Sequence, residues 1–397
     1  MAEQRKAKVV DIHTHMYPTE YVRVLESRNT IPLVRQFPAS PDPRLVLLNA
    51  EVPLLEAATA AQQNDTTPSV LPGRPLTRHF SSLDQKLHFM DTHGIDISVI
   101  SLANPWLDFL PSDEAGQAAA SINASFSTMC ATHPGRLFFF AALPLTAPAS
   151  VLLSTIAALA SLRYCRGVIL GTSGLGAGLD DPALLPVFTA LADASLPIFL
   201  HPHYGLPTSV FGPRAEQGEY GHVLPLALGF PMETTIAVTR MFLAGVFDAV
   251  PGLRMLLAHS GGTLPFLAGR IESCIAHDGL LVKRRQESGT TERRRSLWDV
   301  LRSQIYLDAV IYNEVGLRAA VEAAGGADRL MFGTDHPFFP PVSGDDEDGE
   351  WESVGWNVKA VAEALGGQGE KYEGVMGGNA VRVLRLYEDA GAGERGG

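Results

Sequence analysis

Cysteine, basic side chains and long apolar runs are all scarce in this chain of 397 residues. Its three cysteines, Cys130, Cys165 and Cys274, are widely spaced and form no Cys-x-x-Cys pair, which excludes a disulfide framework and a thiolate zinc site. No run of about 18 apolar residues occurs, so we expect no membrane-spanning helix. The first residues, Met-Ala-Glu-Gln-Arg-Lys, lack the apolar core of a signal peptide. We therefore expect a cytoplasmic protein.

Charge is sparse, and its balance is acidic. Charged residues make up 19 % of the chain and hydrophobic residues 46 %, a composition that supplies a large core and excludes intrinsic disorder. Lys and Arg number 31 against 43 Asp and Glu, which gives a net charge of −12. Binding to phosphate groups requires a basic surface, so this composition argues against nucleic-acid and anionic-membrane partners. We expect a small-molecule substrate instead.

Short apolar segments alternate with helical segments along the chain. The predicted strands cover residues 9–12, 97–102, 137–141, 167–170, 197–200, 254–257, 305–307 and 329–332. The predicted helices include residues 114–132, 149–162, 182–194, 234–244, 263–276 and 314–324. Strands that are nearly all apolar are typical of a parallel sheet covered on both faces. This alternation predicts an α/β fold, a (β/α)8 barrel of the TIM type, which residues 1–397 form as a single domain.

Two regions depart from the alternation. Residues 18–80 follow the first strand, are rich in Pro and Thr, and contain a predicted helix near residues 45–61. We expect them to form an insertion over the mouth of the barrel. Residues 359–387 are predicted to form C-terminal helices that pack outside the barrel.

Histidine and aspartate side chains follow four of the predicted strands. The first strand ends in Asp11-Ile-His13-Thr-His15, and histidines two residues apart on an extended chain point to the same side. The corresponding side chains after strands five, six and eight are His201, His203, His259 and Asp335. Functional groups of a barrel gather where its strands end, so we expect these side chains to share one rim.

Each of these residues also has an ordinary structural interpretation. A single histidine after a strand is commonly a hydrogen-bonded loop residue, and an aspartate before His-Pro can begin a turn. Imidazoles and one carboxylate from four strand ends nevertheless supply three nitrogens and one oxygen, a set suited to Zn²⁺ with an open position. The combination therefore predicts a metal site. Asp308, which follows the seventh strand, is expected to be a supporting or structural carboxylate.

The arrangement resembles the amidohydrolase superfamily, whose members carry His-x-His on strand one, His on strands five and six, and Asp on strand eight. The resemblance covers essentially the whole chain and implies that His13, His15, His201 and Asp335 hold the metal. Members with two metals have a bridging lysine at the end of strand four, where this chain has Val168-Ile-Leu-Gly-Thr. One metal per chain, zinc, is therefore expected, with no organic cofactor.

Longer motifs narrow the resemblance to the branch typified by aminocarboxymuconate-semialdehyde decarboxylase. This similarity lies in residues 201–204, 258–266 and 332–338. Residues 10–18, 71–76, 101–106 and 228–235 are most similar to fungal decarboxylases of isoorotate (uracil-5-carboxylate). The implied reaction is a zinc-dependent, non-oxidative loss of CO₂ that yields uracil, a step of pyrimidine (thymidine) salvage.

The resemblance and the demands of this reaction also suggest roles for side chains around the metal. Direct loss of CO₂ from a vinylic ring carbon would leave a carbanion that cannot delocalise, so that carbon must be protonated first. Asp335 is the expected acid, and His259 is expected to relay the proton. The expected substrate-binding residues are Arg74 for the carboxylate, Asn104 for the ring edge, and Phe230 and Phe338 for the ring faces.

Arg270 has a separate expected role. It lies about 10 Å along the predicted helix after strand six, at ~1.5 Å per residue, and is not expected to reach its own metal. A surface ion pair with Glu272 or Glu233 is one interpretation. The resembled decarboxylases pair as dimers and pass an arginine from this helix into the neighbouring site. We therefore expect a homodimer in which Arg270 contacts the partner's substrate.

Three other functions remain open from the sequence. A decarboxylase of a phenolic acid, such as salicylate or 2,3-dihydroxybenzoate, also handles an oxygen beside the carboxylate. A hydrolase would use the same metal to activate water against an ester, lactone or amide. The third is a barrel that has lost its activity and serves as a scaffold. The complete set of metal ligands argues against this function, because a scaffold does not need them.

Overall fold

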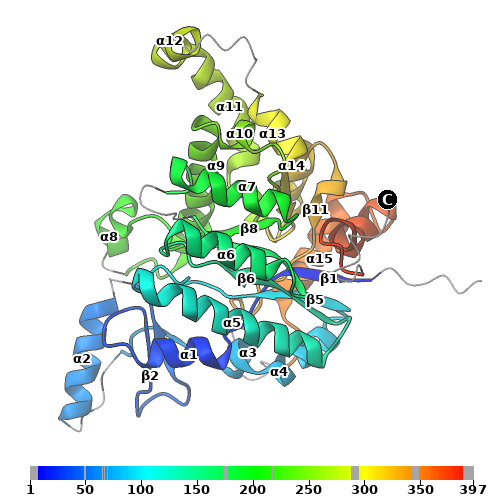
Figure 1. The fold of residues 1–397 in the computed structure, drawn as a ribbon. Coiled ribbons are helices and arrows are strands. Elements are labelled where there is room, and N and C mark those ends of the chain that lie inside the picture. The colour runs from blue at the N-terminus through cyan, green and yellow to red at the C-terminus, as the bar shows by residue number, and fades with distance from the viewer. Residues whose placement is uncertain are drawn as a thin grey trace, which may run out of the picture.

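A parallel sheet of eight strands forms the centre of the computed structural model, which describes residues 8–48, 51–64, 66, 68, 70–172, 178–216, 218–287, 295–341 and 348–387 (Figure 1). In their order around the sheet, the strands are β1 (Val10–His15), β5 (Ile97–Ser101), β6 (Leu137–Ala142), β7 (Cys165–Gly171), β8 (Ile198–His201), β9 (Met255–Leu257), β10 (Ile305–Asp308) and β11 (Leu330–Met331). This order is also their order along the chain, as in a barrel built of successive strand–helix units.

The sheet closes because its last strand returns to its first. Thr14 and His336 form a parallel bridge, and the amide of His15 donates to the carbonyl of His336 at 2.8 Å. The amide of Ile12 likewise donates to the carbonyl of Phe332 at 3.1 Å. The predicted (β/α)8 barrel is thus confirmed, with each strand within a few residues of its predicted position.

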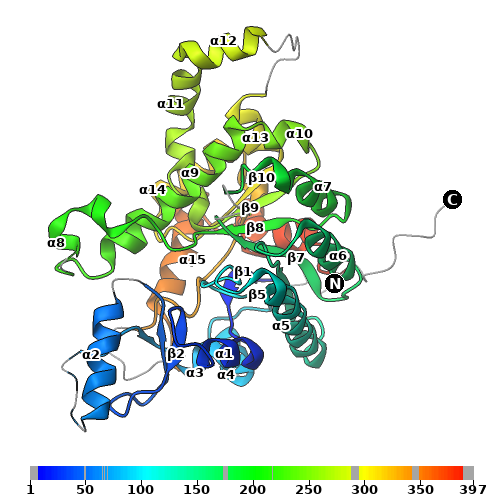
Figure 2. The ribbon, with the colours of Figure 1, turned by 60° about the vertical axis from the view of Figure 1, so that its left-hand side comes forward.

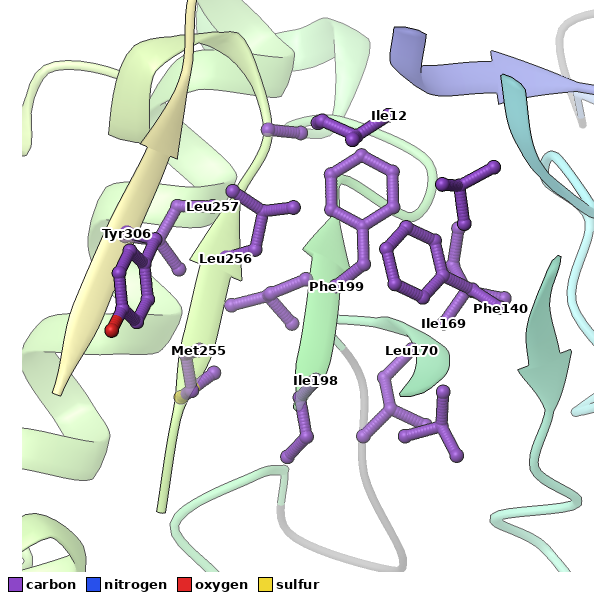
Figure 3. Packing of buried hydrophobic residues seen from close by; sticks show 14 of the residues in the cluster. Ile12, Phe140, Ile169, Leu170, Ile198, Phe199, Met255, Leu256, Leu257 and Tyr306 are labelled. Carbon is purple, nitrogen blue, oxygen red and sulfur yellow. The ribbon is translucent and has the colours of Figure 1, made fainter. Parts of the chain in front are cut away.

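Aliphatic and aromatic side chains fill the barrel. Every residue of β1 and of β6 is buried. Phe140 and Phe199 are in contact, with ring centroids 5.4 Å apart, and Ile12 lies above them in Figure 3. Both faces of the strands are covered, which explains why the strands are apolar throughout. Because the interior is packed, the chemistry of the fold is confined to the carboxyl ends of the strands.

Helices surround the barrel (Figures 1 and 2). The longer ones are α4 (Leu83–Thr92), α5 (Ser112–Thr132), α6 (Ala149–Leu159), α7 (Leu185–Asp193), α9 (Phe230–Leu243), α11 (Leu264–His277), α12 (Gly279–Glu287), α14 (Glu314–Ala324) and α15 (Glu352–Ala364). Helix α9 begins four residues before its predicted start, because Pro231 is accommodated in the first turn, where a missing N–H has no consequence. No helix in the described ranges is long and apolar enough to cross a membrane.

The C-terminal region continues beyond α15 with two short helices, α16 (Glu370–Glu373) and α17 (Asn379–Val383). Between them, the carbonyl of Val375 accepts a hydrogen bond at 2.8 Å from the amide of Phe332, the residue that follows β11. The C-terminal helices therefore pack against the strand that closes the barrel.

The described residues between 18 and 80 form a small unit beside the barrel, at the lower left of Figure 2. Its elements are α1 (Thr19–Glu26), β2 (Leu33–Arg35), β3 (Arg44–Val46), α2 (Val52–Gln63), β4 (Arg74–Pro75) and α3 (Arg78–Ser81). The three strands pair antiparallel in the order β2-β3-β4. The helix predicted near residues 45–61 begins only at Val52, because β3 uses its backbone to pair with β2 and β4.

Candidate metal centre and substrate cavity

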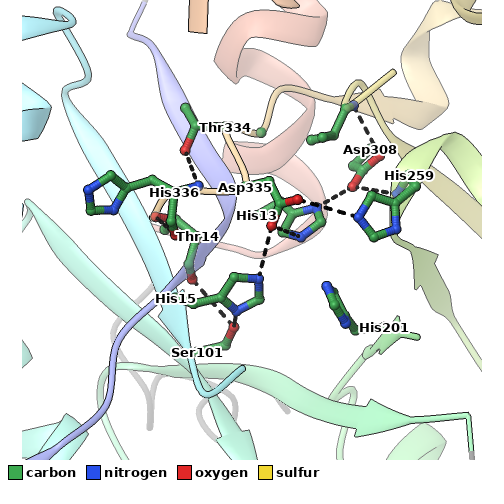
Figure 4. Close-up of polar contacts among 12 residues, drawn as sticks. His13, Thr14, His15, Ser101, His201, His259, Asp308, Thr334, Asp335 and His336 are labelled. Atoms are coloured by element: carbon green, nitrogen blue, oxygen red, sulfur yellow. Dashed lines mark hydrogen bonds and ion pairs between the residues drawn. The ribbon is translucent and has the colours of Figure 1, made fainter. Parts of the chain in front are cut away.

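Four side chains converge at the carboxyl ends of the barrel strands (Figure 4). His13 and His15 come from β1, His201 ends β8, and Asp335 follows β11. One ligand atom from each residue lies within 4.8 Å of the others. The Oδ1 atom of Asp335 is 3.2 Å from Nε2 of His13 and 3.5 Å from Nε2 of His15. The structure thus brings together the four predicted metal ligands.

The chemistry of these side chains fits a divalent cation. Nδ1 of His13 lies 2.5 Å from a carboxylate oxygen of Asp308, Nδ1 of His15 lies 3.0 Å from the carbonyl of Leu102, and Nδ1 of His201 lies 2.8 Å from a backbone carbonyl. Each Nδ1–H therefore donates to an oxygen, which leaves the Nε2 lone pair for the centre of the cluster. Nε2 of His13 and of His15 is buried and faces only the carboxylate of Asp335. Nitrogens in this condition are suited to bind a metal.

Burial and charge set the protonation of the cluster. Burial lowers the pKa of His15 to about 4 and lowers the pKa of His201 well below its usual value, so both imidazoles are neutral, as metal ligands must be. Burial also opposes charge on His13, but the carboxylates of Asp335 and Asp308 raise its pKa to about 10. Without a metal, His13 therefore carries a proton between two carboxylates, and a bound cation would replace that proton.

Asp308 supports the cluster from behind. Besides its contact with His13, its carboxylate accepts hydrogen bonds from the backbone amides of His259 at 2.9 Å, Ser260 at 2.7 Å and Val310 at 3.1 Å. These amides hold the aspartate in place, and the aspartate in turn holds the imidazole of His13. The geometry agrees with the expected supporting role, because Asp308 lies outside the four-residue cluster.

His259 lies beside the cluster. Its Nε2 is 3.5 Å from Oδ2 of Asp335, the carboxylate oxygen other than the one that faces His13 and His15. The backbone of both residues is left-handed, with φ of 54° at His259 and 58° at Asp335. Such conformations are unfavourable for residues other than glycine, and they recur where a side chain must be aimed at a reaction centre.

A cavity of about 560 Å³ opens onto these groups. Its walls include the predicted substrate residues Arg74, Asn104, Phe230 and Phe338, together with His201, His259 and Asp335. The Arg74 guanidinium lies over the Phe338 ring, 5.0 Å from its centroid. The amide nitrogen of Asn104 donates to the carbonyl of His203 at 2.8 Å, which fixes the side chain that was expected to bind the ring edge. The cavity also contains Tyr312, which the sequence analysis did not single out.

His203, the alternative ligand on strand five, lies outside the cluster. Its Nε2 is 2.9 Å from Oδ2 of Asp108, and its amide donates to Glu233 at 2.9 Å. Its ring also fills space at the end of the fourth barrel strand. A Cβ atom at Gly171 would lie 2.2 Å from Nδ1 of His203 and 2.4 Å from Nε1 of Trp106. Two aromatic side chains thus fill the space that any side chain at Gly171 would need.

Arg270 does not line the cavity of its own chain. It is exposed on α11, in a groove with Leu243, Ile271 and Cys274. The carboxylate of Glu272, one suggested partner, accepts a hydrogen bond from the amide of Leu297. Glu233, the other, accepts hydrogen bonds from backbone amides near β8. The position of Arg270 agrees with the expectation that it cannot reach its own metal.

Comparison with known proteins places this geometry in a family. A family model described as Amidohydrolase matches residues 10–386. The crystal structure of the Metarhizium anisopliae IDCase in apo form is 67 % identical, with a TM-score of 0.90 over 96 % of this chain and 98 % of that chain. A gamma-resorcylate decarboxylase of Rhizobium radiobacter is 28 % identical over 71 % of this chain and 82 % of its own length. A 2-amino-3-carboxymuconate-6-semialdehyde decarboxylase of Dictyostelium discoideum is 26 % identical over 76 % of each chain. The chain belongs to the amidohydrolase family.

Proposed function

We propose that this enzyme is a metal-dependent carboxy-lyase that converts isoorotate (uracil-5-carboxylate) to uracil and CO₂ without oxidation. The observation that carries the proposal is the 67 % identity, over 98 % of that chain, to IDCase, whose name we take to mean isoorotate decarboxylase. The more distant relatives in the comparison are also decarboxylases. The product indicates a place in pyrimidine salvage.

The reaction requires an acid that faces the carbon bearing the carboxylate. Protonation makes this carbon tetrahedral and leaves a positive charge on the adjacent ring carbon, which the neighbouring ring nitrogen delocalises. The bond to CO₂ then breaks, and its electrons restore the ring double bond of uracil. His13, His15, His201 and Asp335 would hold a divalent metal, which when bound would supply a template and Lewis acidity for the substrate's carboxylate and neighbouring oxygen. Three imidazoles and a carboxylate favour zinc, one ion per chain.

Asp335 is the proposed acid, and its two carboxylate oxygens face different residues. Oδ1 faces His13 and His15, whereas Oδ2 faces Nε2 of His259. Burial raises the pKa of Asp335, but His13 and the hydrogen bonds around it hold the pKa well below its usual range. That shift describes the metal-free protein. An ionised carboxylate needs a proton donor before it can protonate the substrate, and His259, 3.5 Å from Oδ2, lies in position to be that donor. Its Nε2 delivers the proton to Oδ2, and Asp335 passes it to the ring carbon.

Aromatic and polar side chains bind the planar ring. Phe338 packs against His15 at 5.5 Å between centroids, and Phe230 lies 6.3 Å from His201, so both rings border the metal cluster. A flat pyrimidine between such rings gains stacking and loses water. Arg74 presents its planar guanidinium to the substrate's carboxylate, and Asn104 hydrogen-bonds the ring edge.

We also propose that the enzyme acts as a homodimer with one catalytic domain per chain, in which residues 18–80 cover the mouth. Arg74 brings this insertion into the cavity, and Leu45 of the insertion belongs to the same apolar cluster as the barrel core. Helices α11 and α12 project from the barrel, and Phe266 on α11 is 84 % exposed. A second copy would cover this apolar surface and receive Arg270 in its cavity. Free thiols at Cys130 and Cys165 suit a cytoplasmic location.

Product analysis distinguishes this function from its alternatives. The zinc-loaded enzyme is incubated with isoorotate and, separately, with 2,3-dihydroxybenzoate in ¹⁸O-labelled water. We expect uracil and CO₂ in equal amounts from isoorotate, with no solvent oxygen in the uracil. Turnover of the phenolic acid alone, the substrate class to which the gamma-resorcylate decarboxylase points, would replace the proposed substrate. Solvent oxygen in the product would indicate a hydrolase.

A further inference from the structure

Tyr312 is a cavity residue with an unused hydroxyl. It lies in the loop between β10 and α14 and shares the cavity wall with His259 and Asp335. Its phenolic oxygen is buried and has no hydrogen-bond partner among the described residues. Buried hydroxyls nearly always have a partner, because removing an unpaired hydroxyl from water is unfavourable. Because Tyr312 lines the substrate cavity, a bound substrate could supply the missing partner.

The backbone holds this tyrosine in an unfavourable conformation. Its φ is 59°, in the left-handed region that bulky residues rarely adopt. Only six described residues other than glycine have a positive φ, and three of them, Tyr312, His259 and Asp335, line this cavity. Tyr312 is therefore aimed by the same kind of backbone strain as the proposed acid and its proton relay.

Two contacts fix the position of Tyr312. Its amide donates to Oδ1 of Asn357 at 2.9 Å, and the side-chain nitrogen of Asn357 donates to the carbonyl of Gly333 at 3.3 Å. Asn357 is fully buried on α15, so it ties the loop of Tyr312 to the segment that precedes Asp335. The phenol ring also packs edge-on against Phe339, at 5.3 Å between centroids. The hydroxyl is thus held rigidly, as a binding group must be.

The order of the strands places Tyr312 across the mouth from Asn104. Tyr312 follows β10 and Asn104 follows β5, and the strands between them, β11 and β1, supply Asp335, His13 and His15. A planar substrate at the metal cluster would therefore have Asn104 at one end and Tyr312 at the other. Burial and the carboxylates of Asp335 and Asp308 raise the pKa of Tyr312, which keeps the hydroxyl protonated.

We propose that the hydroxyl of Tyr312 donates a hydrogen bond to a ring oxygen of the substrate, at the end opposite Asn104. This inference rests on the proposed function only for the identity of the ring. It adds a binding residue to the site and explains how the enzyme selects rings with an oxygen at that position. An analogue without such an oxygen would leave the phenol unpaired, which disfavours its binding.

The test compares two Tyr→Phe variants of the full, zinc-loaded enzyme. Tyr312→Phe removes the unpaired hydroxyl, and Tyr306→Phe is the matched control, because the Tyr306 hydroxyl on β10 hydrogen-bonds Arg329 and lies outside the cavity. We expect Tyr312→Phe to weaken uracil binding in calorimetry by about 3- to 10-fold and to raise KM similarly, with no loss of thermal stability. We expect Tyr306→Phe to lower the melting temperature and to leave uracil affinity unchanged.

The outcomes separate this inference from the proposed function. If the wild type decarboxylates isoorotate but Tyr312→Phe binds uracil within twofold of it, the inference is wrong and the function stands. If the wild type acts on 2,3-dihydroxybenzoate instead, the same two variants are measured with that acid. An unchanged KM for Tyr312→Phe would again overturn the role of Tyr312. Should Tyr312→Phe not fold, Tyr312→Leu must show the loss of affinity, and wild-type affinity in that variant would refute the inference.

Discussion

Two groups of buried histidines lie back to back in this molecule, and only one of them is suited to bind a metal. The metal-facing group, His13, His15 and His201, converges with Asp335, whereas His336 of the second group points away from them in Figure 4 and contacts His79. The two groups are alike in residue type and burial. Asp335 and His336 are even neighbours in the chain, yet their side chains belong to different groups.

The two groups differ in what their nitrogens contact. Nδ1 of His336 is 3.0 Å from Nζ of Lys86, and its Nε2 is 3.1 Å from Nδ1 of His79. Nε2 of His79 in turn lies 3.4 Å from the amide nitrogen of Gln85. Every ring nitrogen of this second group has a partner, and a lysine stands where a cation would have to sit. Ring nitrogens that converge on one carboxylate, and not on a lysine or an amide, therefore distinguish the metal centre from the second group.

The largest expected effect comes from replacing one histidine of each group and comparing the metal contents of the two variants. His13→Ala removes a predicted ligand, so we expect the purified protein to contain little metal and to have no measurable activity. His79→Ala, the matched control, should retain about one equivalent of zinc, because its nitrogens contact other side chains. Elemental analysis of protein purified without added metal provides the measurement. Equal metal contents in the two variants would show that the comparison is wrong.

Asp335→Asn separates binding from proton transfer within the metal-facing group. Asparagine keeps the shape and one oxygen but has no transferable acidic proton, so we expect turnover to fall by about 10³-fold or more. Uracil affinity, measured by calorimetry, should change little. A variant that retains metal and near-wild-type turnover would remove Asp335 from the role of acid.

A mixture of two inactive variants tests whether activity at the metal-facing group requires a residue from a second chain. We expect Arg270→Ala and Asp335→Asn homodimers to be nearly inactive. A mixed dimer would contain one site with an intact Asp335 and an Arg270 from the other chain. Random mixing of equal amounts should therefore restore about a quarter of all sites. Subunit exchange, followed by native mass spectrometry, is the control. Confirmed exchange with no recovered activity would contradict a role for Arg270 across the interface.

The smallest effect concerns the second group and is expected in stability alone. Lys86 is fully buried, and its ammonium contacts Thr14, the residue between His13 and His15. Lys86→Met would leave Asp11 and His336 without this partner, so we expect a loss of about 3 kcal/mol in the free energy of unfolding. Zinc content should remain near one equivalent. If Lys86→Met lost its zinc but kept the stability of the wild type, this prediction would be wrong.

The same variant has a pH signature. Burial lowers the pKa of Lys86 from its usual value of 10.5 to about 8, although the negative charge of Asp11 raises it. Between these two values the unfolded chain binds more protons than the folded one, so this lysine makes stability rise with pH. The difference in unfolding free energy between wild type and Lys86→Met should therefore grow from pH 8 to pH 10. Chemical denaturation across that range measures it.

The metal-facing group could be predicted from the sequence because it follows a simple rule of the fold. His13, His15, His201 and Asp335 each stand at a strand end, and strand ends of a barrel meet at one rim. Lys86 could not be predicted in the same way. It lies in a helix among polar residues, where a lysine is ordinarily solvated, and only the packing of α4 against the strands buries it.

Tyr312 and the small sheet of the insertion were missed for a related reason. Nothing about a tyrosine in a loop indicates an unpaired hydroxyl, because that property depends on what the fold brings around it. Strands β2, β3 and β4 have two or three residues each, too few to show an alternating pattern. Their pairing depends on contacts between residues distant in the sequence, which local patterns do not report.

The space at Gly171 has a consequence for attempts to redesign this enzyme. Trp106 and His203 occupy the volume that any side chain at this position would need. A Gly171→Lys change therefore would not build a second metal site, because the lysine would first have to displace two aromatic rings. Such a site would also require smaller side chains at Trp106 and His203. Packing around Gly171, as much as the absence of a lysine, therefore opposes a second metal ion at this strand end.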